Sequence, residues 1–272
     1  NCAPYEHPII VVFTEEIKSI LVAEFGWNGN SIIVCGGRID TNSFAPLRDE
    51  RSKLPGDKVR IALLSRIDPD KRMGFVGLVE ELEAIPAVLP LGNIDVEVYG
   101  MGEDMAWWRL YIENQKMPTG VDVRLCGQVT VTAEFLNEFD LVVGQGRGVL
   151  EALAAGVPVA VSGERGYMGR VSTTNFAMFA RTNFTGRSMS RQTHLAQDLV
   201  QILDHPAEKR EKMMLRSIVE EQYSSESFCH VIIQQINTKG SNLIPAGGSA
   251  IKALWKFMCG QMKTVKHRAR TQ

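Results

Sequence analysis

Short, continuously apolar segments alternate with helical stretches along most of this chain, and this alternation constrains the fold more than any other feature. Segments such as Ile61–Leu64 and Leu141–Val143 contain no polar residue, which is typical of strands that are buried on both faces. Stretches with helical periodicity lie between most of these strands, as parallel pairing requires. The sequence therefore predicts an α/β domain built on a doubly wound parallel sheet.

The predicted domain covers residues 1–236 and ends in three helices that close it. These helices are expected at about Arg191–Asp204, Ala207–Tyr223 and Glu226–Ile236. The predicted strands are Pro8–Thr14, Ser31–Cys35, Val59–Ser65, Asp95–Tyr99, Val121–Cys126, Leu141–Val143 and Val157–Val161. We interpret Gly163–Gly169, which carries several glycines, as a flexible loop.

The composition excludes several classes of protein. The chain has 272 residues, of which 44% are hydrophobic, and a net charge of −1, so it can bury a full core and does not favour nucleic acid as a partner. No run approaches the roughly 18 apolar residues of a membrane span. The five cysteines lack CxxC spacing and the five histidines are dispersed, so we expect reduced thiols, no metal site and a cytoplasmic location.

A glycine turn follows one predicted strand, in Asp140–Gly156 (DLVVGQGRGVLEALAAG). Such glycines let the backbone approach a pyrophosphate at a helix N-terminus, as in NAD-binding proteins, and Glu164 stands where that motif has its ribose ligand. Two facts oppose a dehydrogenase. The motif normally follows the first strand of its domain, whereas this turn follows several βα units, and Val149 stands in place of the third glycine.

Three other predicted strands are also followed by polar or glycine-rich segments. Arg66 and Lys71 come after one strand, and both can point at a phosphate. Gly100 and Gly102 come after the next strand, where small residues would leave room for a ligand, and Gly127–Val129 ends the strand after that. Because the carboxyl ends of parallel strands share one edge, where open α/β sheets bind their ligands, these segments predict a phosphate-binding edge.

Together these segments resemble the donor-binding half of GT-B-fold glycosyltransferases, in the group of retaining enzymes called family 4. The likeness covers most of the chain, from about Thr14 to Ile236. Its motifs, in order, are CGGRIDTNSFAPL at Cys35–Leu47, the pair Arg66 and Lys71, the GxG of Gly100 and Gly102, the GxV of Gly127–Val129 and LEAxAxGxPV at Leu150–Val159. Each motif alone is unspecific, whereas their ordered combination is specific.

The resemblance implies that this edge binds a UDP- or GDP-linked sugar for transfer to an acceptor such as an envelope glycan or a lipid. The expected contacts are Arg66, Lys71, Gly146, Arg147 and Gly148 for the donor diphosphate, Glu151 for the ribose, Gln128 and Val129 for the base, and Gly100 and Gly102 beside them. We expect no metal and no other cofactor, because Arg66, Lys71 and the helix N-terminus would neutralise the leaving diphosphate. The catalytic residue stays unidentified. The alternatives are a nucleotide-sugar epimerase on the same fold and a non-catalytic nucleotide-binding module.

Two departures from the family's pattern bear on the activity. The family has two glutamates eight residues apart, and the first, which contacts the donor sugar, falls at Val143 here. Gln145 or Arg147 could take its place. The acceptor-binding half of such an enzyme should precede Asn1 and is absent from the sequence. We therefore expect a piece of a longer enzyme, which binds donor without transferring sugar by itself.

The last segment, residues 237–272, differs in charge from the rest of the chain. It holds seven Lys or Arg and no acid, which leaves 23 of the 30 basic residues and all 31 acidic residues before it. Apolar residues from Ile251 to Val265, including Trp255, recur at helical spacing. A basic amphipathic helix with a Trp is typical of an interfacial membrane element, so we expect a peripheral location on an anionic inner leaflet. Packing against the missing half and a disordered tail are the alternatives.

Overall fold

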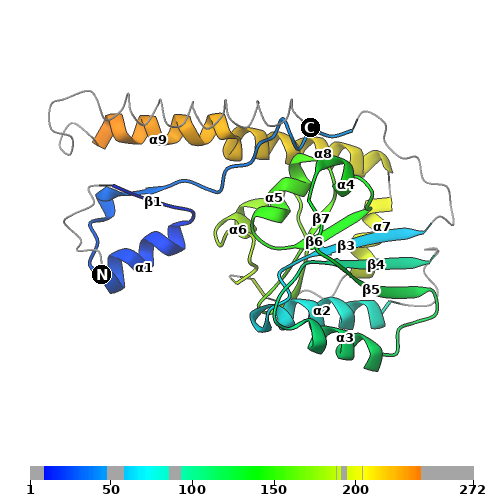
Figure 1. The fold of residues 1–272 in the computed structure, drawn as a ribbon. Coiled ribbons are helices and arrows are strands. Elements are labelled where there is room, and N and C mark those ends of the chain that lie inside the picture. Colours follow the sequence, from blue (N-terminus) through cyan, green and yellow to red (C-terminus); the bar gives the residue numbers. More distant parts are fainter. Residues whose placement is uncertain are drawn as a thin grey trace, which may run out of the picture.

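The strands of this protein form two separate sheets. The computed structural model describes residues 9–47, 58–85, 93–187, 189–190, 195–203 and 205–239. The main sheet has the strand order β5-β4-β3-β6-β7-β8, and the small sheet consists of β1 and β2 (Figure 1). The strands are β1 (Ile10–Val12), β2 (Ile32–Val34), β3 (Val59–Leu64), β4 (Ile94–Tyr99), β5 (Val121–Gly127), β6 (Leu141–Gly144), β7 (Val159–Gly163) and β8 (Gly166–Arg170).

Helices cover both faces of the main sheet, which confirms the predicted doubly wound α/β fold. The helices are α1 (Glu15–Phe25), α2 (Arg72–Glu83), α3 (Met105–Asn114), α4 (Ala133–Leu136), α5 (Arg147–Ala154), α6 (Phe176–Ala180), α7 (Leu195–Leu203), α8 (His205–Tyr223) and α9 (Ser225–Lys239), with the 3-10 turns η1 (Gly29–Ser31) and η2 (Pro69–Lys71). Residues of α2, α3 and α7 pack on one face, and residues of α4, α5, α6 and α8 pack on the other.

Strand β3 lies at the topological switch point of the main sheet. It pairs in parallel with β4 on one side and with β6 on the other. The chain runs from β3 outward through β4 and β5, then returns across β3 to β6 and continues to β7. The winding therefore reverses between β3 and β6, and sheets of this type bind their ligands beyond the carboxyl ends of the strands at that point.

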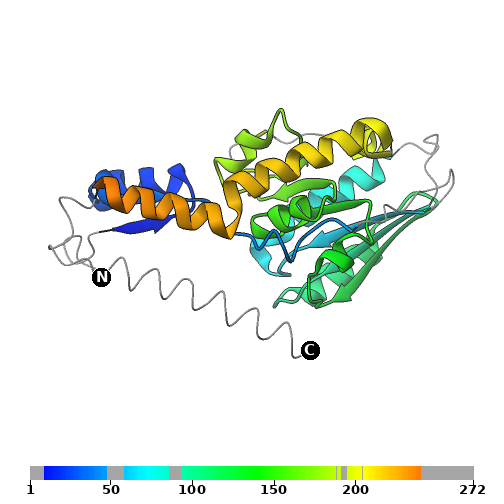
Figure 2. The same cartoon turned by 90° about the horizontal axis from the view of Figure 1, so that it is seen from above.

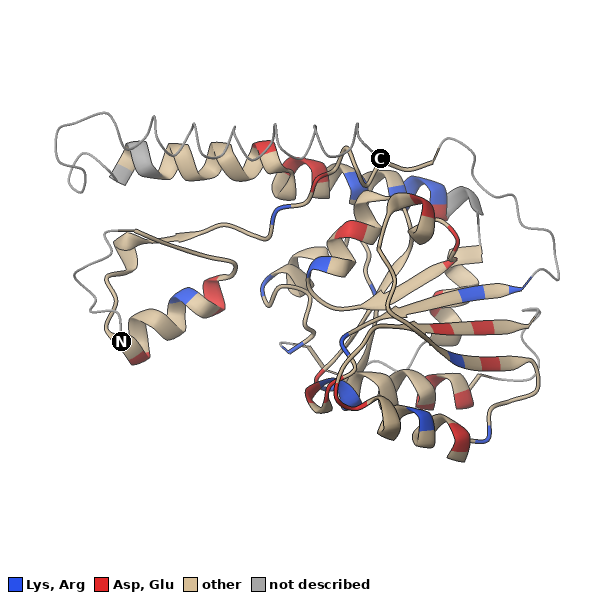
Figure 3. Ribbon diagram, in the orientation of Figure 1, with Lys and Arg blue, Asp and Glu red and all other residues tan. Residues whose placement is uncertain are grey.

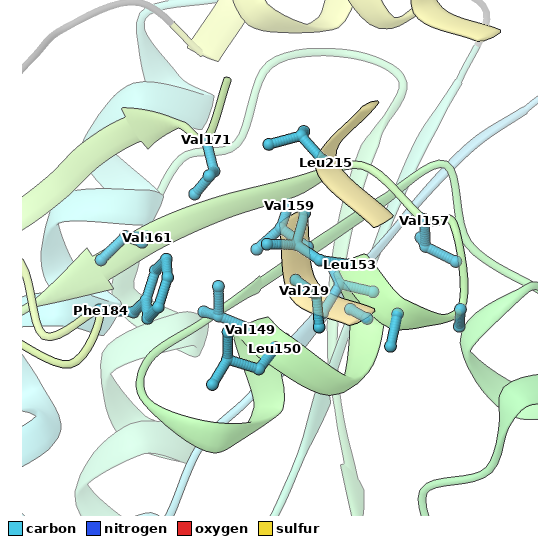
Figure 4. Close-up of a cluster of buried hydrophobic side chains, with 14 of the residues drawn as sticks. Val149, Leu150, Leu153, Val157, Val159, Val161, Val171, Phe184, Leu215 and Val219 are labelled. Carbon is cyan, nitrogen blue, oxygen red and sulfur yellow. The ribbon is translucent and has the colours of Figure 1, made fainter. Parts of the chain in front are cut away.

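Strand β6 shows why a continuous apolar segment predicted a strand that is buried on both faces. Leu141 and Val143 belong to the apolar cluster on the α2 face, whereas Val142 belongs to the cluster on the α5 face. Figure 4 shows the second cluster, in which side chains of α5 pack against β7 and α8. Helix α5 ends just before Gly156, whose left-handed φ of 72° confirms the predicted helix end.

The hairpin β7–β8 corrects the prediction of a flexible loop at Gly163–Gly169. Gly163 ends β7, and Gly166–Arg170 forms β8, which pairs antiparallel with β7 and is largely buried. The hydroxyl of the buried Tyr167 donates a hydrogen bond to Asp198 at 2.7 Å. Glycines normally mark turns in a sequence, but here their small size lets helix α2 pack closely over the strand, so burial outweighs the local signal.

The small sheet corrects the expectation that residues 1–236 share one sheet. Strands β1 and β2 pair in parallel with each other and lie apart from the main sheet (Figures 1 and 2). Helix α1 has no buried residue, and this unit exposes the large apolar side chains of Val11, Phe13, Ile20, Val22 and Phe25. A sequence pattern identifies a strand but does not identify its pairing partner, which is why the separation was missed.

The link between the small sheet and the main body runs beside the junction of α8 and α9. The amide of Ile39 donates to the carbonyl of Tyr223 at 2.7 Å, and a Cβ on Gly36 would lie 2.5 Å from the Tyr223 ring. Helix α9 extends from this junction toward the side of the small sheet (Figures 1 and 2). Residues 240–272, which hold most of the predicted basic tail, lie outside the described residues. Within the described ranges, no helix is long and apolar enough to cross a membrane.

Candidate functional site

The two segments that carry predicted site residues after β3 and β6 begin side by side at the switch point. Leu64, the last residue of β3, pairs with Gly144, the last residue of β6. A Cβ on Gly144 would lie 3.1 Å from the Leu64 carbonyl oxygen, so the two strand ends approach closely. The segment with Arg66 and Lys71 and the glycine turn therefore leave the sheet at adjacent positions.

Two glycines of α2 bring Lys71 to the glycine turn. A Cβ on Gly77 would lie 2.4 Å from the Gly166 Cα, and one on Gly74 would lie 3.1 Å from the Ser162 carbonyl oxygen. Helix α2 consequently packs directly on the β7–β8 hairpin, and the Ser162 hydroxyl donates to the Gly74 carbonyl at 2.6 Å. The turn η2 precedes α2, so the Lys71 ammonium reaches Gln145, with 3.4 Å between Nζ and Oε1.

Both predicted cations of the segment after β3 already have acidic partners. Arg66 forms an ion pair with Asp68 at 2.5 Å, and Lys71 forms one with Asp70 at 2.8 Å. The hydrogen bond from the Lys71 ammonium lowers the pKa of the Asp70 carboxyl. The Arg66 side chain is 66% exposed and the Lys71 side chain 15% exposed. Lys71 is therefore the cation that the fold holds in place, and an anion could bind Arg66 only in competition with Asp68 and Asp70.

The glycine turn presents the N-terminus of α5 at the same edge. Gly146 precedes the helix with φ 64° and ψ −130°, a conformation that favours glycine strongly, and it has no side chain with which to cap the helix. The first amides of a helix have no partner within it and lie at the positive end of its dipole. The Gly146 amide itself donates to the Phe184 carbonyl at 3.3 Å. The expected phosphate contacts therefore fall to the amides that follow it.

Arg147 and Glu151, for which different roles were predicted, contact each other. Arg147 Nε donates to Glu151 Oε1 at 2.6 Å across one helical turn. The Arg147 side chain is 72% exposed, whereas that of Glu151 is 12% exposed. The Arg147 guanidinium is thus exposed to solvent at the carboxyl edge of the sheet. The second carboxylate oxygen of Glu151, Oε2, takes no part in this hydrogen bond.

Gly100 and Gly102 have a role other than the one predicted. A Cβ on Gly100 would lie 1.8 Å from the Ser65 carbonyl oxygen, and one on Gly102 would lie 2.2 Å from the Ile67 carbonyl oxygen. These glycines allow the loops after β3 and β4 to pack backbone against backbone, so they do not leave room for a ligand at those positions. Their effect on the site is indirect, because they hold the loop that carries Arg66.

Gln128 and Val129 lie at some distance from the phosphate-binding segments. They follow β5, and both β4 and β3 separate β5 from β6 in the sheet. At a strand spacing of about 4.8 Å, β5 and β6 are roughly 14 Å apart. Gln128 is exposed and Val129 half-buried. The residues share the predicted edge, but no described contact joins them to Lys71 or to the glycine turn.

Val143 is a core residue. Its side chain is fully buried, and in the main sheet it pairs with Leu63 and Ala160. An acid here would enter the apolar cluster. The next polar side chain along the chain toward the edge is Gln145. Over the described part of the chain, no group of three or more His, Cys, Asp or Glu residues is arranged to hold a metal ion.

Two neighbours of the glycine turn were missed by sequence reasoning. Ser162 lies in an apolar strand and gave no signal. Asn183 and Phe184 have left-handed φ values of 52° and 55°, and this turn lies against Gly146. Asn tolerates that conformation better than most residues, so Asn183 followed closely by Gly186 was a turn signal that could have been recognised.

The fold resembles those of solved GT-B-type glycosyltransferases. A glycosyltransferase from Rickettsia africae matches with a TM-score of 0.62 and 15% identity over 87% of this chain and 65% of that chain. TarM from S. aureus, in a structure that holds UDP, matches with a TM-score of 0.56 and 18% identity over 85% of this chain and 44% of that one. Sucrose-phosphate synthase from Thermosynechococcus elongatus matches with a TM-score of 0.57 and 18% identity over 86% of this chain and 58% of that one.

At these identities the likeness establishes the fold alone. The chain spans less than two thirds of each of these enzymes. No protein-family model matches the sequence, and no curated protein matches it.

Proposed function

We propose that this chain is the donor-binding part of a glycosyltransferase of the hexosyltransferase type. It binds a UDP- or GDP-linked sugar at the carboxyl edge of the main sheet and supports transfer to an envelope glycan, a lipid or another acceptor. One observation carries the proposal: the two segments predicted to bind phosphate leave adjacent strands at the switch point, and Lys71 and Gln145 join them. UDP is the first nucleotide to test, because the TarM structure holds it.

The proposed chemistry uses fixed positive charge. When a sugar leaves its nucleotide, negative charge develops on the diphosphate, and preorganised donors stabilise it. Lys71, Arg66 and the first amides of α5 would supply that stabilisation, a task that Mg²⁺ performs in other enzymes. Glu151 Oε2 would accept a hydrogen bond from a ribose hydroxyl while Oε1 keeps its bond with Arg147.

Calorimetry with UDP and GDP tests the site. We expect Lys71→Ala to weaken binding by about 1.5–3 kcal/mol, the range for a lost hydrogen bond to a charged group. Glu151→Ala should weaken binding similarly, and Arg66→Ala less, because Arg66 must leave Asp68 to bind phosphate. Lys116→Ala is the control, since Lys116 is exposed and precedes β5 at the opposite edge of the sheet.

Several results would contradict the proposal. Unchanged affinity in all three variants, with the fold intact, would refute the site. Binding of NAD in preference to UDP and GDP would favour a dehydrogenase, although the glycine turn follows β6 and not the first strand of the main sheet. An epimerase would convert a labelled nucleotide-sugar into its epimer without an acceptor, which product analysis would reveal.

A further inference from the structure

The side chain of Gln145 joins three segments of the edge. Its Oε1 accepts a hydrogen bond from Lys71 Nζ at 3.4 Å, and its Nε2 donates to the Ser162 carbonyl at 3.3 Å. Ser162 in turn donates through its hydroxyl to the Gly74 carbonyl at 2.6 Å. The series connects η2 and α2, the turn after β6, and β7, so Gln145 occupies the centre of the edge around the switch point.

The two neighbours determine the orientation of the Gln145 amide. A lysine ammonium only donates hydrogen bonds, and a backbone carbonyl only accepts them. Gln145 must therefore present its oxygen to Lys71 and its nitrogen to Ser162. A glutamate would place a second acceptor against the Ser162 carbonyl, and an apolar side chain of the same length would make neither bond.

Gln145 is uncharged, and this affects how much positive charge Lys71 can offer to a ligand. The ammonium has three donors, of which Asp70 and Gln145 receive two. The Asp70 side chain is 56% exposed and pairs with Lys71 as a counterion. Gln145 instead holds the ammonium beside the N-terminus of α5 without adding a negative charge. Loss of the Gln145 bond would leave Asp70 as the partner that draws the ammonium toward solvent.

We propose that Gln145 is a positioning residue for Lys71: it holds the ammonium at the switch point so that the remaining N–H meets a phosphate of a nucleoside diphosphate. The inference rests on the proposed function, because it assumes that Lys71 contacts the diphosphate. It adds that Gln145 acts on the phosphate affinity through Lys71, and that Glu and Met cannot replace it.

A double-mutant cycle tests the inference. The probe is UDP or GDP, whichever the unmodified chain binds more tightly, and the matching nucleoside is measured by ligand-observed NMR. We expect Gln145→Met to weaken nucleoside diphosphate binding about tenfold, near the lower end of the range for one hydrogen bond to a charged group. In a Lys71→Met background the same substitution should have less than about a twofold further effect, because residues that act through one contact are not additive. The affinity for the nucleoside should not change.

Two further variants complete the design. Gln145→Glu should also weaken diphosphate binding, and the affinity should depend less on salt, because the carboxylate adds a second negative charge beside Lys71. Gln222→Met, an exposed site on α8, is the matched control and should bind as the unmodified chain does. Thermal unfolding of each ligand-free variant verifies that it is folded, and Gln145→Asn, which is polar but one methylene shorter, replaces Gln145→Met if that variant does not fold.

The inference and the proposed function fail in different ways. If the unmodified chain binds neither UDP nor GDP, the proposed function is wrong. If it binds one of them and Gln145→Met binds equally well, or if the effects of the Gln145 and Lys71 substitutions add in full, Gln145 does not position Lys71. An equal loss of nucleoside and diphosphate affinity would also overturn the inference, because it would indicate a general change in the fold.

Discussion

Gly148 and Gly100 are both glycines at the carboxyl edge, but the space around them differs. A Cβ on Gly148, in the first turn of α5, would meet no atom within 4 Å. A Cβ on Gly100 would lie 1.8 Å from the Ser65 carbonyl oxygen, and its φ of 152° is unusual for any other residue. Packing thus requires glycine at position 100 but not at position 148, where only the proposed approach of a phosphate to the helix N-terminus would favour it.

We therefore expect Gly148→Ala to separate stability from binding. Alanine favours a helix over glycine by up to about 1 kcal/mol, so the free energy of unfolding should stay the same or rise. Affinity for UDP or GDP should fall about tenfold, because the methyl group occupies the surface where a phosphate would meet the first amides of α5. Urea unfolding and calorimetry on one preparation provide both numbers.

Gly100→Ala is the matched comparison for Gly148→Ala. It should lower the free energy of unfolding by about 1–3 kcal/mol, because the loops after β3 and β4 must move apart. Nucleotide affinity should fall with stability in this variant. If Gly148→Ala binds nucleotide normally, the N-terminus of α5 does not hold the phosphates.

At the scale of the elements, the strands β3, β4 and β5 carry charged residues (Figure 3), and ion pairs between their side chains connect the strands. Arg60 on β3 donates to Glu97 on β4 through Nε at 3.1 Å and Nη2 at 2.8 Å, and the Tyr99 hydroxyl donates to the same carboxylate at 2.6 Å. Burial of Glu97 opposes its ionisation, but the hydrogen bonds from Tyr99 and Arg60 outweigh that effect and lower its pKa. This network helps to hold the strands whose ends carry the candidate site.

Glu97→Gln should therefore destabilise the protein in a pH-dependent way. At pH 7 we expect a loss of about 1–3 kcal/mol, because Arg60 and Tyr99 lose a charged partner. A lowered pKa stabilises the folded state above the ordinary value of 4.5, and this contribution disappears as the pH falls through the lowered value. The difference in urea midpoint between the two proteins should thus shrink below about pH 4.5.

The control for Glu97→Gln is Asp122→Asn. Asp122 lies on β5 and pairs with Arg124 at 3.4 Å, but its side chain is 57% exposed. Its substitution should change stability by less than about 0.5 kcal/mol at pH 7. A constant difference between Glu97→Gln and the unmodified chain from pH 3 to pH 8 would exclude the network as its cause.

At the scale of the whole molecule, the small sheet and α1 expose large apolar side chains within the described part of the chain. Phe13 and Phe25 are among them, and exposed apolar surface of this kind marks places where another element packs. We propose that an acceptor-binding half packs there and completes the small sheet. The chain spans 44% of TarM and 65% of the Rickettsia africae enzyme, which supports the proposal.

We accordingly expect the isolated 272 residues to bind donor without transferring sugar. If the acceptor half supplies part of the reaction site, incubation with a radiolabelled UDP- or GDP-sugar and candidate acceptors should release at most a little free sugar by slow hydrolysis. Calorimetry on the same sample verifies that the donor site is intact. Robust transfer by these residues alone would refute the need for a second half.

The basic tail provides a prediction about location. Near an anionic leaflet each cation is worth roughly 1 kcal/mol, so the seven Lys and Arg of residues 237–272 could hold the protein at a membrane. Co-sedimentation with anionic vesicles at low salt should capture the full chain and should fail without residues 245–272 or with neutral vesicles. Equal binding with and without the tail, or no binding to anionic vesicles, would exclude the membrane role and leave packing on the proposed acceptor half or a disordered tail.

The sequence by itself determined the local features of this protein. Continuous apolar runs such as Leu141–Val143 specified buried strands, and Gly156 specified the end of α5, because burial and backbone conformation depend on the residue and its near neighbours. The order of the motifs was enough to predict that the segments after β3 and β6 lie at one edge, since parallel strands share their carboxyl ends.

Only the tertiary structure decided how these segments meet. Three features depend on residues that are distant in sequence. They are the separation of β1 and β2 into a small sheet, the backbone contact that requires Gly100, and the hydrogen bond between Lys71 and Gln145. Each depends on how helices and strands pack, and the order of residue types along a chain does not give the distance between two packed elements. The candidate site was therefore predictable only as a list of segments, whereas the assignment of Lys71 as its fixed cation required the packing of α2 on the β7–β8 hairpin.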